Sequence, residues 1–207
     1  MGDDYKFRYG KTLAGRAERP APAGTGGRTA GLSGGGAAPV ESRVKFLGHA
    51  VHQQLIPFPF GLLATAVIFD VFYLILESGE LATVAYWMIV AGIVGGLVAA
   101  PFGLIDWTGI PKGTRARKVG AVHGLGNLLV LVLFAVSWLL RREDPTAPQA
   151  LALALSFAGF ALAGVTGWLG GELVDRHAVG IDHGAHPNSP HSFSGRPASD
   201  DGPALAR

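Results

Sequence analysis

The sequence contains no cysteine and few charged residues among its 207 positions. Without cysteine, the chain itself provides no disulfide, thiolate metal site or iron–sulfur ligand. Charged residues make up 15% of the sequence and hydrophobic residues 49%, and residues 81–105 carry no charge at all. A soluble domain needs charge spread along its helices, so this composition favours a membrane protein. The net charge of only +2 does not favour nucleic acid as a partner.

Four apolar segments predict an all-α fold, an integral membrane bundle of four transmembrane helices. The expected spans are 58–76, 82–105, 119–140 and 151–174. Each is long enough to cross about 30 Å of hydrocarbon at 1.5 Å per residue. Pro57 and Pro59 disfavour helix in the residues before them, so we expect the chain to break there and the first span to begin near Phe58. The membrane domain as a whole is expected to cover residues 44–182.

Two tails flank this domain. Residues 1–43 are rich in glycine, alanine and proline, and residues 183–207 are polar. Neither segment has enough apolar surface to repay the entropy of ordering, so we expect tails that are disordered or ordered by a partner.

The basic residues predict an orientation. All but two of the 17 lysines and arginines precede the first span, lie between the second and third, or follow the fourth. Arg141 and Arg142 alone lie on the other side. Basic residues concentrate in cytoplasmic segments, so both termini should be cytoplasmic.

Small residues on the helices indicate where the spans pack together. In lipid, helices associate through close contact of small residues, and the second and fourth spans carry stripes of glycine and alanine at helical spacing. These stripes continue to Asp106 and to His177, at the end where the third span begins with His123 and Asn127. We therefore expect a polar cluster at the cytoplasmic boundary, made of His49, His52, Asp106, His123 and His177. Asp70 sits apart near the middle of the first span, where an ionisable group is costly and usually faces the bundle interior.

Three stretches resemble a bacterial membrane family known only as domain of unknown function 2231. They read GHAVHQQLIPFPFGLLATAVIFD, APFGLIDWTGIPKGTRARKVGAVHGLGN and TGWLGGELVDRHAVGID. The resemblance implies four membrane helices, the bacterial inner membrane, and a link to membrane electron transfer, because some relatives accompany redox proteins. It also implies that the polar positions of the family correspond to His49, His52, Asp70, Asp106, His123 and Asn127. The family often has proline after both early histidines, whereas Ala50 and Gln53 stand here.

Histidines on facing helices of a membrane bundle can hold haem b. We expect His123 to pair with His52 or His177 if haem is bound. A non-haem metal held by His49, His52, Asp106 and His123 is the alternative, and purely structural pairing of these side chains needs no cofactor.

Several functions remain open from the sequence alone. The chain could be a small haem or metal redox protein, or an accessory subunit of a larger redox or photosynthetic complex that contacts other membrane proteins. A structural or interaction protein without cofactor is a further alternative, and proton or ion transport through Asp70 and Asp106 is another. No G-x-S-x-G nucleophile motif is present, so a non-enzymatic role is favoured.

Overall fold

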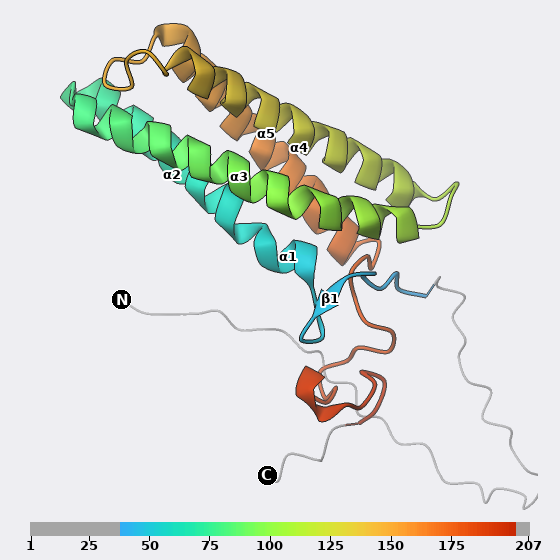
Figure 1. The fold of residues 1–207 in the computed structure, drawn as a ribbon. Coiled ribbons are helices and arrows are strands. Elements are labelled where there is room, and N and C mark those ends of the chain that lie inside the picture. The colour runs from blue at the N-terminus through green and yellow to red at the C-terminus, as the bar shows by residue number, and fades with distance from the viewer. Residues whose placement is uncertain (1–37, 202–207) are drawn as a thin grey trace, which may run out of the picture. The chain divides into compact units, whose positions relative to one another are not determined.

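The computed structural model describes residues 38–201, so most of the predicted N-terminal tail lies outside the described residues (Figure 1). A two-stranded antiparallel hairpin, β1 (Lys45–Phe46) and β2 (His49–Ala50), comes first. The helices follow as α1 (Val51–Leu55), α2 (Pro57–Leu76), α3 (Gly79–Gly109), α4 (Arg115–Leu140) and α5 (Ala150–Asp175), and a short 3-10 turn, η1 (Ser192–Ser194), closes the described chain.

The predicted bundle of four membrane-length helices is confirmed, and each helix extends beyond the bounds expected for its span. Within residues 38–201, four helices are long and apolar enough to cross a membrane. The break expected at Pro57 is slight, because Ile56 keeps a right-handed helical conformation (φ −54°, ψ −37°) between α1 and α2. Pro57 occupies the first turn of α2, where its missing N–H costs no helical hydrogen bond. The segment 51–76 therefore behaves as one span with a short interruption.

The helices form an antiparallel bundle in which α2 packs on α3 and α4 packs on α5 (Figure 1). A side chain at Gly92 would collide with Leu63 of α2, and one at Gly159 would collide with Phe134 of α4. Glycine at these positions lets the backbones approach closely, which is the main source of helix association in lipid. The core between the α2–α3 pair and the α4–α5 pair is apolar. It includes Leu63, Ala66, Val67, Ile89, Val130, Phe134 and Ala163.

The outer surface of the helices is also apolar. Large side chains such as Leu97, Leu125 and Trp168 are each about 60% exposed or more. An aqueous surface rarely carries such a continuous apolar area, whereas hydrocarbon is its natural surrounding. The fold is therefore that of an integral membrane protein.

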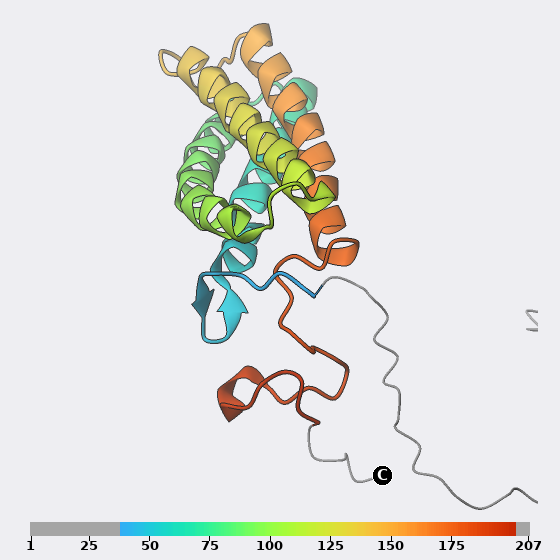
Figure 2. The same cartoon turned by 90° about the vertical axis from the view of Figure 1, so that its right-hand side faces the viewer.

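The segment before the first span and the segment after the last one meet at one end of the bundle (Figure 2). Val40 pairs with Val179 in a parallel bridge, in which the Val40 amide donates to Ala178 and the Gly180 amide donates to Val40. The α3–α4 connection lies at the same end, while the α2–α3 and α4–α5 connections lie at the opposite end (Figure 1).

Candidate functional site

His52 is held against α3 near the hairpin end of the bundle. Its Nδ1 lies 3.0 Å from the carbonyl oxygen of Ala99. A carbonyl can only accept a hydrogen bond, so Nδ1 carries the proton and a neutral ring keeps its lone pair on Nε2. The ring lies directly over Gly103, where a Cβ atom would approach it to 2.6 Å. Glycine at position 103 is thus required for the imidazole to sit on the helix.

His123 makes an equivalent contact between α4 and α5. Its Nδ1 lies 2.8 Å from the carbonyl oxygen of Thr166, so this nitrogen also donates. The amide nitrogen of Asn127 lies 3.2 Å from Nε2 and donates to it. Thr166 in turn donates from Oγ1 to Asn127 Oδ1 at 2.9 Å. His123, Asn127 and Thr166, the last through both its hydroxyl and its backbone carbonyl, form a closed hydrogen-bonded circuit that joins α4 to α5.

The two histidines lie at the same level of the bundle. The contacts between Gly96 and Leu131 and between Trp107 and Gly120 define one antiparallel register of α3 and α4. In that register Gly103, which carries the His52 ring, is level with Gly124, the neighbour of His123. His123 itself lies against Gly170 of α5. We call this level, His52 with His123, the histidine layer.

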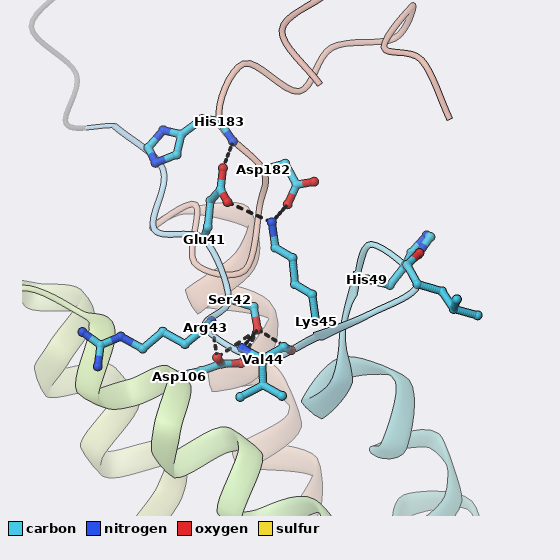
Figure 3. Close-up of polar contacts among 10 residues, drawn as sticks. Glu41, Ser42, Arg43, Val44, Lys45, His49, Asp106, Asp182 and His183 are labelled. Carbon is cyan, nitrogen blue, oxygen red and sulfur yellow. Dashed lines mark hydrogen bonds and ion pairs between the residues drawn. The ribbon is translucent and has the colours of Figure 1, made fainter. Parts of the chain in front are cut away.

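The other predicted members of the cluster lie outside the histidine layer. Asp106 accepts hydrogen bonds from Ser42 Oγ at 2.8 and 2.9 Å and from the Arg43 amide at 2.7 Å (Figure 3). It therefore anchors the N-terminal segment to α3 and makes no hydrogen bond to a histidine. Within residues 38–201, the side-chain hydrogen bond of His49 is to the Leu47 carbonyl in its own hairpin. His177 follows the end of α5, about two helical turns beyond Gly170. Among residues 38–201, no three His, Asp or Glu side chains are close enough to share a metal ion.

A second polar site surrounds Asp70 near the opposite end of the bundle. Arg141, the residue after α4, donates from Nη1 and Nη2 to the two Asp70 oxygens at 2.6 and 2.8 Å. Both side chains are fully buried. Ser137 accepts from Arg141 Nε at 3.2 Å, and Ser156 accepts from Nη2 at 2.8 Å. The pair therefore joins α2, α4 and α5, and Asp70 lies in the last third of α2 rather than near its middle.

Sequence reasoning did not identify Arg141 as the partner of Asp70. Arg141 directly follows the predicted third span and was considered only as one of the two basic residues on that side of the membrane. A signal did exist, because a buried carboxylate in lipid requires a cation or several donors, and only Arg141 and Arg142 lie on that side.

A third polar cluster lies outside the spans and connects the N-terminal segment to the C-terminal one (Figure 3). Lys45 Nζ lies 2.8 Å from Glu41 and 2.6 Å from Asp182, and the His183 amide donates to Glu41 at 2.8 Å. The bonds from Lys45 and His183 lower the pKa of the Glu41 carboxyl. Burial opposes the charge of Lys45, yet the bonds to Asp182 and Glu41 raise the pKa of its amine. We call these four residues the tail clasp.

Four apolar helices, a buried ion pair between them and an apolar outer surface define the class as a four-helix integral membrane protein. Residues 48–183 match the family described as "Predicted membrane protein (DUF2231)", which is more than half of the chain. The chain belongs to this family. No curated protein and no solved structure matches it.

Proposed function

We propose that the protein takes part in membrane electron transfer by binding haem b, with His52 and His123 as the residues that would hold its iron. The observation that carries this proposal is the histidine layer. Two imidazoles from different helices lie at one level, and each donates its Nδ1 proton to a backbone carbonyl. Histidines that bind iron commonly direct one nitrogen to a protein acceptor in this way, which leaves Nε2 for the metal.

The donor set fits haem better than a metal held by protein side chains alone. A porphyrin supplies four nitrogen donors, so one or two imidazoles complete the coordination of its iron. A protein-only site needs three or more ligands, and residues 38–201 bring no such group together. Of the two expected pairs, His52 with His123 is favoured, because His177 lies beyond the end of α5.

The chain's own residues would orient the two rings and raise their basicity. The carbonyls of Ala99 and Thr166 accept from Nδ1, which strengthens the lone pair on Nε2. Asn127 occupies Nε2 of His123, so its amide must turn away when iron binds. Bound haem would supply one-electron transfer between ferric and ferrous iron.

An absorption spectrum of the full chain, purified from haem-supplied cells, tests this proposal. A Soret band that shifts on reduction with dithionite, with a haem content near one per chain, is expected. A preparation without a Soret band, obtained under conditions that load a known b-type cytochrome, would contradict haem binding.

A cofactor-free accessory subunit of a larger redox or photosynthetic complex is the second candidate. The observation that favours it is the closed circuit of His123, Asn127 and Thr166, in which every side-chain polar group has a partner. Purification in mild detergent distinguishes the two, because an accessory subunit co-migrates with other membrane proteins and carries no haem. Transport is less favoured, since Asp70 is paired with Arg141 and Asp106 lies at the other end of the bundle.

We further propose that the protein resides in the bacterial inner membrane with its hairpin end in the cytoplasm. Arg141 is buried against Asp70, so the opposite end presents only Arg142 as a solvent-accessible basic residue among the described positions. The hairpin end exposes Lys112, Arg115 and Lys118 on the α3–α4 connection. The structure thus sharpens the charge asymmetry that favours this orientation.

A further inference from the structure

The hairpin before the first span has an unusual turn. Leu47 and Gly48, the two central residues, both have positive φ values of 51° and 84°. A two-residue turn of this kind prefers asparagine or glycine at both positions, because a side chain with a full Cβ is strained there. Leucine at position 47 is therefore a costly choice for the fold. Backbone strain that the surrounding structure retains often marks a functional residue.

The side chains around this turn are apolar and exposed. Phe46 is 61% exposed and Leu47 is 57% exposed. Ser192 of the C-terminal segment packs directly on Gly48, where a Cβ would lie 2.5 Å from it. Its neighbour Phe193 is 73% exposed. We call Phe46, Leu47 and Phe193 the apolar tip.

The apolar tip adjoins the membrane along the chain. Val51 begins the first candidate span, so Leu47 is only four residues from it. The outward side of that span continues with exposed apolar residues, including Phe58 and Phe60. The α3–α4 connection, which lies at the same end of the bundle, exposes Lys112, Arg115 and Lys118. Basic residues at this end would attract an anionic headgroup layer, and apolar side chains would enter it.

We propose that the apolar tip inserts into the headgroup region of the cytoplasmic leaflet and anchors the hairpin end of the bundle at the membrane surface. Phe46 and Leu47 enter from the hairpin, and Phe193 enters from the C-terminal segment that rests on the turn. The occupant is lipid rather than a protein, because Leu47 lies only four residues before the first span, whose outward side is apolar. The strained Leu47 is retained because the turn must present an apolar group there.

The absence of cysteine allows a direct test on the full chain in liposomes of phosphatidylethanolamine and phosphatidylglycerol. A nitroxide is attached to Leu47→Cys, and its collisions with oxygen and with a water-soluble nickel complex are compared. Leu104→Cys, on the lipid-facing side of α3, is the membrane control, and Asn188→Cys, exposed in the C-terminal segment, is the aqueous control. An oxygen-to-nickel ratio several-fold above that of Asn188→Cys is expected at Leu47→Cys. A ratio equal to that of the aqueous control overturns the proposal, and a protein-docking surface would give this result because no partner is present.

A second variant excludes an effect of the label itself. The nitroxide is placed at Ser194→Cys, beside Phe193, with either leucine or asparagine at position 47. Leu47→Asn suits the left-handed turn and removes the apolar group, so the fold should persist. The oxygen-to-nickel ratio at position 194 should then fall several-fold toward the aqueous value. An unchanged ratio in the folded variant would contradict insertion of the apolar tip.

Discussion

At the scale of single residues, the Asp70–Arg141 pair has the largest expected effect on stability. Both groups are fully buried, so removing one charge leaves the other without a partner in a low-dielectric interior. Asp70→Asn should reduce the free energy of unfolding by about 3–5 kcal/mol. Unfolding by SDS in mixed micelles, followed by circular dichroism, measures this change.

The neighbouring arginine offers a matched control for that substitution. Arg142 is exposed, with its guanidinium 5.6 Å from the centre of the Trp138 ring. Arg142→Met should change the stability by less than about 1 kcal/mol. The double variant Asp70→Asn, Arg141→Met should be more stable than Asp70→Asn alone, because no buried charge remains. Equal effects of Asp70→Asn and Arg142→Met would show that the pair is not buried as described.

The hydrogen-bond partners of individual side chains were also the part of the site that the sequence predicted least well. The histidines and Asp70 were identified correctly as residues inside or beside the spans. The partners Arg141, Thr166 and Ser42 were not, because each lies 43 or more positions along the chain from the histidine or aspartate that it contacts. Asp106 was expected to lie in a cluster with the histidines. Helical spacing shows which face of the helix carries Asp106, but not which neighbouring segment packs on that face.

At the scale of helices, small residues determine how closely α4 and α5 can approach. A Cβ at Gly159 would lie 2.9 Å from Phe134, a fully buried side chain. Gly159→Val should therefore reduce the free energy of unfolding by about 1–3 kcal/mol through overpacking. Gly164 on the same helix has no heavy atom within 4 Å of its Cβ position, so Gly164→Val is a matched control. Similar losses in both variants, measured by SDS unfolding, would contradict this packing.

The tail clasp should respond to pH in a defined direction. The folded pKa of Glu41 is lowered from its ordinary value of 4.5, so its stabilising contribution is present above that value. It is lost as the pH falls through the lowered pKa. The protection of the His183 amide, corrected for intrinsic exchange, should therefore decrease on acidification below pH 4.5.

Lys45 sets the upper end of the pH range over which the tail clasp is stable. Its folded pKa is raised above 10.5, so its contribution is present at neutral pH and is lost as the pH rises through the raised value.

The control for the acid response is Glu41→Gln, in which the amide of His183 should be less protected at neutral pH and no longer respond to acid. Acid-dependent protection that persists in Glu41→Gln would show that another group controls this contact.

The four helices themselves were predictable because apolar runs of this length with at most one charged residue have few other stable structures. Their ends were not, because charged residues such as Arg115 and Asp175 continue the helices beyond the apolar runs. The break expected at Pro57 was overestimated, since a proline in the first turn is compatible with a nearly continuous helix.

At the scale of the whole molecule, the orientation can be measured with single cysteines. Lys112→Cys lies on the α3–α4 connection, and Thr146→Cys lies on the α4–α5 connection. In intact cells, a maleimide that does not cross the inner membrane should label Thr146→Cys and leave Lys112→Cys unlabelled until the cells are broken. The reverse pattern would place the hairpin end outside the cytoplasm.

The histidine layer is the central claim, and the reduced-minus-oxidised spectrum of matched histidine variants tests it most directly. His52→Ala and His123→Ala should lose bound haem or the low-spin spectrum, because each would remove one of the two residues proposed to hold the iron. His49→Ala and His177→Ala should keep the spectrum of the unaltered protein, since neither residue lies in the layer. Equal spectra in all four variants, with haem bound, would contradict ligation by His52 and His123.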